Sequence, residues 1–520
     1  METESLSSKY GAGFKSMRGE APVCIADVEK RDWLRIAQAV CADDGILISL
    51  WGTDRSASSE PYIVSVTYWV TEGLLWLRLP ADAQAGYPDL SMIFPAAVRM
   101  QRALFDLLGI RAYGAEDTRF WINHGRWPRD YFPLRKQFSG LEEFDNQLEP
   151  YPFVSVEGDG VHEIGVGPIH AGTIEPGHFR FSIVGEKVLR LEELLGYKHK
   201  GIDKLFTRRE LLNGHLLAGR ISGDSTVAYS WAYCMAVEAA TGCQIPERAQ
   251  WLRALLLERE RIAMHLGDLG ALGNDAALTF GLSQFSLLRE KWVRVNARLF
   301  IHRFMMDCII PGGTIVDIDG DGIDLLLQQC QEIEKEVQTL QVIYAEHSGL
   351  QDRYFTLGRV PPKLAKELGL CGMAGRASDQ ARDARVDQLM PLSVYTQLKV
   401  RKVTKKAGDA AARVLVRFEE IFESIRLLRE IVRKLPSGAI NTPLTSDITD
   451  GFGVGCVEGW RGPVFVALEA DKHGKIIRCH CHDPSWQNWP VLEHAIIGDI
   501  VPDFPLINKS FNLSYSGHDL

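Results

Sequence analysis

The sequence predicts a mixed α+β protein, in which a small N-terminal α+β domain precedes a mainly α-helical bundle with flanking β-hairpins. In residues 1–140, short β-like runs stand beside a single helical pattern. Beyond residue 320, two long stretches repeat apolar residues at alternating spacings of four and three, as packed helices do. A chain of 520 residues also exceeds one ordinary hydrophobic core, so at least two domains are expected.

The N-terminal domain, residues 1–140, is predicted from three strands and one helix. The strand-like runs are Ile46–Trp51, Tyr62–Trp69 and Gly73–Leu79, and the helical pattern covers Ala96–Leu108. The following segment is acidic, has no clear period and contains two prolines. We therefore predict a linker over residues 141–160 and a second domain over residues 161–520.

The second domain begins with alternating Phe179, Phe181 and Ile183, which predict a β-hairpin, and a later hairpin is predicted over Val464–Leu468 and Lys475–Cys479. Between them, Pro246–Leu269 reads as a helix with proline in its first turn. Two further helices are predicted, each with a seam, that is, one line of apolar residues along the helix, and the two seams are expected to pack on each other. The first seam is Leu326, Cys330, Ile333, Val337, Leu340 and Tyr344, and the second is Val414, Phe418, Ile421, Ile425, Leu428 and Val432. The apolar C-terminal tail is expected to be buried against this bundle.

Composition excludes several classes of function. The net charge is −9 and no basic stripe is present, so nucleic acid is not an expected partner. No window approaches the roughly 18 apolar residues of a membrane span, and the N-terminus does not resemble a signal peptide. Because the ten cysteines include no C-x-x-C pair, we expect reduced thiols in a cytoplasmic protein without a membrane span of its own.

Two motifs resemble metal sites. The run DIDGDG at Asp317–Gly322 looks like the start of a calcium loop, but the twelfth position is Gln328, so an acidic turn before a helix is predicted. In CHCHD at Cys479–Asp483, a strand would place Cys479 and Cys481 on one face and the two intervening histidines on the other. Convergence on one ion is then unfavourable, and a structural role is predicted.

Two other segments are candidates for chemistry. GPIHAGTIEPGHFRF at Gly167–Phe181 combines His170, Glu175 and His178, and reads equally as a proton-handling loop or as a tight turn with surface polar groups. GRISGDSTVAYS at Gly219–Ser230 contains Ser222 and Ser225 just before a helical run. A serine there is expected to cap the helix, and no Ser-His-Asp arrangement is apparent.

A resemblance then covers nearly the whole chain. Gly167–Phe206, ERERIAMHLGDLG, GRASDQARDAR, RCHCHDPSWQNWP and DFPLINKSFNLSYSGHDL match, in order, the large subunit of group-four membrane-bound NiFe hydrogenases and the D subunit of respiratory complex I. FPAAVRMQRALFDLLGIR and YFPLRKQF resemble the complex I C subunit. A fused C–D arrangement is typical of formate-hydrogenlyase and hydrogenase-four type subunits.

One departure from that family is informative. By resemblance, hydrogenases hold nickel and iron with four cysteine thiolates, and those positions here are Ser222, Ser225, Ser514 and Gly517. Nickel and low-spin iron depend on soft, deprotonated sulfur, which neither serine nor glycine supplies. The resemblance therefore predicts that this chain binds no NiFe centre and no other cofactor of its own.

The resemblance implies a peripheral subunit on the cytoplasmic face of a membrane complex, with an iron–sulfur small subunit and membrane-embedded antiporter-like and anchor subunits as partners. We expect electrons to arrive from the partner's iron–sulfur cluster, with a quinone as the candidate acceptor. The quinone-binding tyrosine of complex I would fall near Gly223, so the tyrosine that contacts the quinone headgroup is missing here. No G-x-G-x-x-G follows a strand, so any NADH chemistry belongs to the complex rather than to this chain.

Two hypotheses follow from the resemblance. An oxidoreductase subunit coupling electron transfer to ion translocation would have an open polar cavity, lined by the candidate residues His170, Glu175, His178, Arg220, Tyr229 and Arg478. By resemblance, Glu175 relays protons, Arg220 lies near the partner's cluster and Arg478 lies in a strand lining the site. A structural connector would instead have a cavity closed around Ser222, Ser225, Ser514 and Tyr515.

Overall fold

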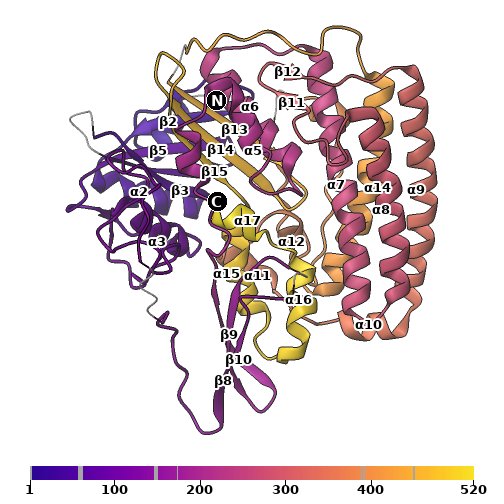
Figure 1. Ribbon diagram of the computed structural model, residues 1–520. Helices are drawn as coiled ribbons and strands as arrows, with labels where there is room; N and C mark the ends of the chain where they lie inside the picture. Colours follow the sequence, from indigo (N-terminus) through magenta and orange to yellow (C-terminus); the bar gives the residue numbers. More distant parts are fainter. Residues whose placement is uncertain are drawn as a thin grey trace.

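The computed structural model describes residues 3–56, 62–145, 150–171, 174–387, 389–390, 393–448 and 451–520. Its N-terminal part is a five-stranded sheet in the order β1-β2-β5-β4-β3, drawn in indigo in Figure 1. The elements of this part are α1 (Thr3–Tyr10), β1 (Lys15–Ser16), β2 (Val23–Asp27), α2 (Lys30–Ala42), β3 (Ile46–Asp54), β4 (Tyr62–Val70), β5 (Gly73–Ala81), β6 (Tyr87–Pro88), α3 (Ala97–Leu108) and β7 (Ala112–Tyr113). The three predicted strands and the predicted helix are confirmed.

A three-stranded antiparallel sheet, β8 (Val161–Val166), β9 (His178–Val184) and β10 (Lys187–Leu194), follows and extends away from the body of the molecule in Figure 1. The turn between β9 and β10 confirms the first predicted hairpin. On β9, Phe179 and Phe181 are buried against Phe504, with ring centroids 4.7 and 5.0 Å apart. The alternation that predicted the strand therefore arises from packing against the C-terminal tail.

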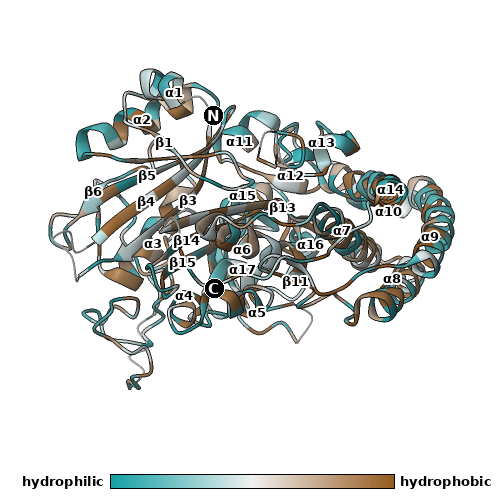
Figure 2. Ribbon diagram, turned by 90° about the horizontal axis from the view of Figure 1, so that it is seen from above, coloured by the Kyte–Doolittle hydropathy of each residue, from teal (hydrophilic) through white to brown (hydrophobic). Residues whose placement is uncertain are grey.

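The helical part is built around four long helices, α7 (Glu247–Asp275), α8 (Thr279–Phe300), α9 (Gly320–Glu346) and α14 (Ala410–Lys434), which lie side by side in Figures 1 and 2. Every residue of both predicted seams is buried, and Tyr344 meets Phe418 edge-on with ring centroids 5.6 Å apart. The predicted packing of α9 on α14 is confirmed. The longest shared surface of α14 is nevertheless with α7.

Shorter elements connect this bundle to the rest of the chain. They are α4 (Ile202–Phe206), η1 (Leu211–Asn213), α5 (Gly214–Ala218), α6 (Thr226–Thr241), β11 (Ile309–Ile310), β12 (Gly313–Thr314), α10 (Ser348–Tyr354), α11 (Pro362–Glu367), α12 (Gly372–Arg376) and α13 (Tyr395–Leu398). Helix α6 is apolar on all sides and almost completely buried. It occupies the centre of the molecule, between the bundle and the last sheet (Figure 1).

The last sheet consists of β13 (Phe452–Glu458), β14 (Pro463–Ala470) and β15 (Ile476–His482), all antiparallel. The predicted hairpin is β14–β15, and β13 is an additional strand. Gly453 and Gly455 of β13 lie against α6, where a Cβ atom would come within 1.8 and 1.9 Å of carbonyl oxygens of α6. These glycines allow the close approach that sets the position of the α6 N-terminus.

The C-terminal tail forms α15 (Ser485–Ala495), η2 (Val501–Asp503), α16 (Phe504–Phe511) and α17 (Tyr515–Asp519). Most of its residues are buried, which confirms the prediction that the tail packs into the molecule. Helix α16 packs on α7 and α14, and α17 ends beside the last sheet. The tail thereby brings residues distant in sequence next to the loop that precedes α6.

Strand β3 joins the N-terminal sheet to the last sheet. The Trp51 ring stacks on His480 of β15, with centroids 4.8 Å apart and planes 10° from parallel, and Ser49 Oγ lies 2.7 Å from His480 Nε2. Thr53 Oγ1 donates to Glu469 Oε1 of β14 at 2.6 Å. In the described part of the chain, no helix has the length and apolar character needed to cross a membrane.

Candidate functional site

The loop before α6 and the turn that begins α17 meet in the interior. Ser222 and Ser514 are both buried, and their hydroxyl oxygens are 3.0 Å apart. Ser514 is the N-cap of α17 and accepts a hydrogen bond from Gly517 N at 2.9 Å. Hydrogen bonds therefore join Ser222, Ser514 and Gly517 directly, and these are three of the four positions that the resemblance assigns to hydrogenase thiolates.

An aspartate and an arginine lie beside these serines. Arg461, just before β14, donates to Asp224 Oδ1 at 2.9 Å and to Asp224 Oδ2 at 2.5 Å, and Ser222 Oγ donates to Asp224 Oδ1 at 2.6 Å. Arg461 is buried, whereas one third of the Asp224 side chain remains exposed. Burial alone would raise the pKa of Asp224, but Arg461 and the serine hydroxyls lower it to about 2.

Asp483, which follows β15, closes the other side of the site. Its Oδ2 accepts from Tyr229 Oη at 2.8 Å, and its Oδ1 accepts from Ser485 N at 2.8 Å. Burial and the neighbouring Asp483 raise the pKa of Tyr229 well above its usual value, so the phenol stays protonated and donates. A Cβ added at Gly517 would lie 2.5 Å from Asp483 Oδ2, so a cysteine there requires Asp483 to move.

The serines do not cap α6 as the sequence predicted. Ser225 occupies the N-cap position, but its side chain makes no capping hydrogen bond, and its Oγ lies 3.3 Å from Asp224 Oδ1. Instead Glu260 of α7 accepts from Val227 N at 2.7 Å and from Ala228 N at 3.2 Å. A carboxylate from another helix replaces the local cap because α7 runs directly beneath this helix end.

The His170–Glu175–His178 loop lies next to this site. Glu175 Oε2 accepts from Ser516 N at 3.0 Å, its Oε1 accepts from Ser516 Oγ, and Lys198 Nζ is 3.7 Å away. His170 Nε2 lies 2.8 Å from Gly177 O. Glu175 is thus adjacent to the α17 turn and half exposed, as a proton-exchanging group requires.

The other predicted residues lie in different parts of the described structure. Arg220 lies at the surface in a bidentate pair with Asp307, at 2.6 and 2.7 Å. Arg478 is buried, donates to Asp203 Oδ2 at 2.7 Å and lines a cavity of about 40 Å³ between β3 and β15. Tyr229 is held by Asp483. The structure thus places Arg220, Tyr229 and Arg478 in different surroundings, and a single pocket lined by all six residues stays a prediction.

A larger groove lies beside His178, between the end of β9 and the segment that follows α3. Its volume is about 660 Å³. Aromatic and basic side chains line it: Arg119, Phe120, His124, Trp127, Tyr151, Phe153, His178, Arg180 and Tyr197. His178 Nε2 has no hydrogen-bond partner in the described structure. Burial lowers the pKa of His178, so its imidazole is neutral at pH 7, and the unpaired Nε2 atom is itself buried.

Side chains of both metal-like motifs make contacts within the fold. Cys479 and Cys481 share one face of β15 with their sulfur atoms 4.0 Å apart, while His480 and His482 point to the other face. Asp319 caps α9, and its Oδ1 accepts from Gly322 N at 2.8 Å. Within the described residues, no group of three or more His, Cys, Asp or Glu side chains is arranged to hold a metal ion.

Sequence reasoning missed Asp224, Glu260, Arg461 and Asp483. Asp224 lies between the two singled-out serines, and Asp483 ends the CHCHD run, so both stood inside motifs already noticed. Glu260 stood inside the quoted segment ERERIAMHLGDLG, but nothing local indicated that it reaches the α6 N-terminus. Arg461 carried no local signal, because it reaches the site from an element distant in sequence.

Known proteins are similar to this chain in both its N-terminal and its helical parts. Residues 26–143 match the family described as the 30 Kd subunit of respiratory-chain NADH dehydrogenase, and residues 272–450 match its 49 Kd subunit. Formate hydrogenlyase subunit 5 of Escherichia coli (strain K12) is 30% identical, over 91% of this chain and 85% of that protein. Hydrogenase-4 component G of the same organism is 31% identical, over 100% of this chain and 94% of that protein.

A solved structure is also similar. It is described as the membrane-bound sulfane sulfur reductase, an archaeal respiratory membrane complex. One of its chains is 26% identical to this chain with a TM-score of 0.65, and the match covers 69% of this chain and 99% of that one.

Proposed function

This chain belongs to the family of fused 30 Kd and 49 Kd large subunits of membrane-bound hydrogenases and complex I, and on that basis we propose that it acts as a metal-free connector. It would join an iron–sulfur partner subunit to an ion-translocating membrane arm, at the cytoplasmic face of the membrane. Reduction of the partner would then change charge at the interface, and the change would pass through this chain to the arm.

The observation that carries this proposal is the packing at the four thiolate positions. Ser222 and Ser514 contact each other at 3.0 Å, and Asp483 stands where a side chain at position 517 would extend. Hard hydroxyl oxygens replace soft sulfur. The residues present therefore do not fit a NiFe centre, and we assign no step of the function to one.

Metal analysis of the intact complex tests this directly. The complex is purified from cells grown with nickel, beside a relative that retains the four cysteines, and nickel is counted per large subunit. We expect the relative to contain about one nickel per subunit and this chain to contain less than about a tenth of that amount. Stoichiometric nickel in this chain contradicts the proposal.

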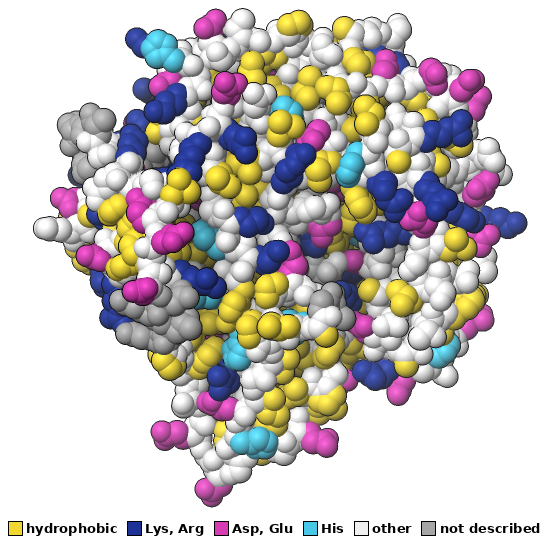
Figure 3. Space-filling model, viewed as in Figure 1, with side chains coloured by type: hydrophobic (Ala, Val, Ile, Leu, Met, Phe, Trp, Pro, Cys, Tyr) yellow, Lys and Arg dark blue, Asp and Glu magenta, His cyan; other side chains and the backbone are white. Residues whose placement is uncertain are grey.

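The groove beside His178 supports a second candidate function, an oxidoreductase subunit that binds a quinone-type carrier. Its volume of about 660 Å³ lies within the range of small-molecule sites. The aromatic rings that line the groove suit a planar ring. On the face shown in Figure 3, basic and hydrophobic side chains intermingle across the middle, as a partner-binding surface requires.

Menadione, a small naphthoquinone without a long isoprenoid tail, is a suitable probe for this groove. We expect Trp127→Ala to weaken menadione binding at least about tenfold, because a stacking surface is lost. The exposed Tyr113→Ala, outside the groove, serves as the control and should bind as the wild type does. Equal affinity of the two variants for menadione would contradict quinone binding in this groove. The connector would then be the only one of the two proposed functions that still stands.

A further inference from the structure

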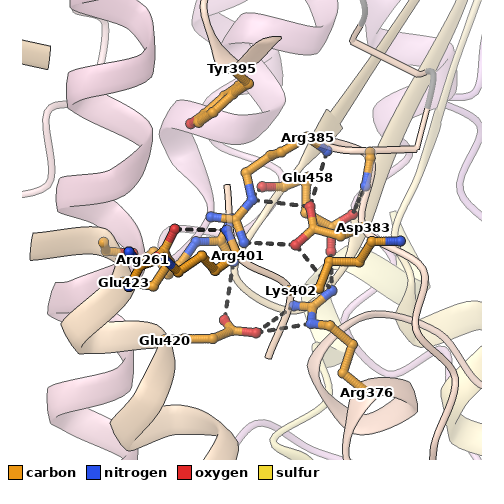
Figure 4. A network of polar contacts seen from close by, with 12 residues as sticks. Arg261, Arg376, Asp383, Arg385, Tyr395, Arg401, Lys402, Glu420, Glu423 and Glu458 are labelled. Carbon is orange, nitrogen blue, oxygen red and sulfur yellow. Dashed lines mark hydrogen bonds and ion pairs between the residues drawn. The ribbon is translucent and has the colours of Figure 1, made fainter. Parts of the chain in front are cut away.

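A cluster of buried charged side chains lies between α7, α14, β13 and the segment that follows α12, as Figure 4 shows for most of its members. We call it the ion cluster. Its members are Glu258, Arg261, His265, Arg376, Asp383, Arg385, Glu420 and Glu458. No member has a side chain more than 2% exposed.

The contacts within the ion cluster are close. Arg376 bridges Glu420 Oε1 and Glu458 Oε1, each at 2.7 Å. Arg385 joins Asp383 at 2.7 Å to Glu258 at 3.0 Å. Arg261 reaches Glu258 at 3.5 Å and Glu420 at 3.4 Å, and His265 Nε2 is 2.9 Å from Glu420 Oε2. The members form one continuous network across four parts of the fold.

The charges of the ion cluster do not balance when every carboxyl group is ionised. It contains three guanidinium groups, which stay charged, and four carboxyl groups. Burial lowers the pKa of His265, so its imidazole adds no charge at neutral pH. One uncompensated negative charge would remain in a water-free interior, where it is costly.

The groups packed around the ion cluster do not supply the missing positive charge. Arg417 is paired with Asp268 at 2.8 Å, and Arg426 with Glu423 at 2.5 Å. The Tyr395 hydroxyl donates to Glu258 Oε1 at 2.7 Å and is neutral. Lys402, also drawn in Figure 4, is paired with Asp387 at 2.5 Å. Other titratable neighbours are Cys371 and Cys456, whose thiol pKa values burial raises, and Glu260, which faces the α6 N-terminus.

The proton needed for balance has one favoured position. Burial alone would raise the pKa of Glu420, but Arg376 and His265 hold it well below its usual range. Arg385 likewise lowers the pKa values of Glu258 and Asp383 against their burial. Glu458 receives a single guanidinium contact, and its Oε2 accepts only from Ala384 N at 3.0 Å. Burial and the nearby Asp383 raise the pKa of Glu458.

We propose that the ion cluster is a proton-binding site, in which the carboxyl group of Glu458 holds one proton at neutral pH beside Arg376. With that proton, three guanidinium groups face three carboxylates, and the network is neutral. This assignment does not depend on the connector function and adds a proton store to the chain.

The ion cluster borders a cavity on one side and a tryptophan next to the candidate site on another. Arg385 and Tyr395 line a cavity of about 240 Å³, so one edge of the ion cluster borders a space large enough for water. At the opposite edge, His265 lies edge-on to Trp460, with ring centroids 6.0 Å apart. The Trp460 indole N–H donates to Asp224 O at 2.8 Å. The stored proton therefore lies next to the layer that carries the four former thiolate positions.

Two matched variants of the full chain test the proposal. Glu458→Gln and Glu420→Gln each remove a buried carboxyl group that contacts Arg376. Glutamine resembles a neutral acid, so Glu458→Gln should unfold near the wild-type urea concentration at pH 7. Glu420→Gln removes the nearest ionised partner of Arg376 and one of the two carboxylates beside Arg261, so this variant should unfold at a clearly lower concentration. The reverse order, or failure of Glu458→Gln alone to fold, overturns the proposal.

Proton counting separates this role from a purely structural one. The chain is unfolded in weakly buffered urea at pH 7, and released protons are measured with an indicator dye. Unfolded glutamate is ionised at pH 7, so the wild type should release one proton per chain more than Glu458→Gln. Glu423→Gln, one turn along α14 from Glu420, is the control and should release as many protons as the wild type. Equal release by the wild type and Glu458→Gln overturns the proposal.

Discussion

At the scale of single residues, charged groups lie beside the serines that the resemblance aligns with sulfur ligands. The two serines of the loop before α6 both contact Asp224. Asp224 in turn binds Arg461, and Asp483 binds Tyr229. Polar contacts between these side chains therefore hold the site together.

The Asp224–Arg461 pair leads to a prediction about pH. The pKa of Asp224 is lowered from 3.8 to about 2, so the pair stabilises the fold fully above the unfolded value and loses this effect as pH falls toward 2. We expect Asp224→Asn to lower the free energy of unfolding at pH 7 by about 1.5–3 kcal/mol, the usual contribution of a charge-assisted hydrogen bond. Urea unfolding measures the change.

The difference between wild type and Asp224→Asn should shrink steadily as the pH is lowered from about 4 toward 2. Asp321→Asn, an exposed aspartate in the first turn of α9, is the control and should show no such dependence. A difference that stays constant across this pH range would show that Asp224 stabilises the fold by packing rather than by charge.

At the scale of elements, helix α14 has two buried faces of different chemistry. The apolar seam was predicted from its spacing, and Phe418 packs between Tyr344 and Phe285, with ring centroids 5.6 and 5.9 Å away. The polar face carries Arg417, Glu420 and Ser424, which are equally buried. A helical wheel of this segment reads as amphipathic, although both of its faces lie in the interior.

The apolar face of α14 is open to a direct test. Phe418→Ala should lower the free energy of unfolding by about 3–5 kcal/mol, because a large buried ring is lost and a cavity is left. Leu415→Ala, on the same helix but 40% exposed, is the matched control. Thermal or urea unfolding of the two variants gives the comparison. A similar loss of unfolding free energy in both variants would mean that packing along the seam does not stabilise the bundle.

At the scale of the whole molecule, the N-terminal sheet and the helical part are joined by polar and stacked contacts rather than by an apolar patch alone. Ser49, Trp51 and Thr53 alternate along β3 and all contact the last sheet. This explains why β3 is buried almost along its length. The same joint contains the small cavity at Arg478, which Asp519 of α17 also lines.

Much of the architecture could be read from the chain alone. The periods of β3, β4, β5, α3, α9 and α14 were visible because each buries one regular set of apolar side chains. Strand β13 was not visible, since its sequence FGVGCVE owes its glycines to the approach of α6 and lacks simple alternation. The cap of α6 was misread because the group that satisfies it comes from α7.

The sequence by itself determined the α+β class and the helix seams, because these depend on local spacing and residue identity. Only the tertiary structure decided that Asp224, Arg461 and Asp483 lie beside Ser222, Ser514 and Gly517. It alone also decided that three arginines and four carboxyl groups share one buried network. The energy of a buried charge depends on which partners reach it, and partners from distant segments meet only in the folded chain.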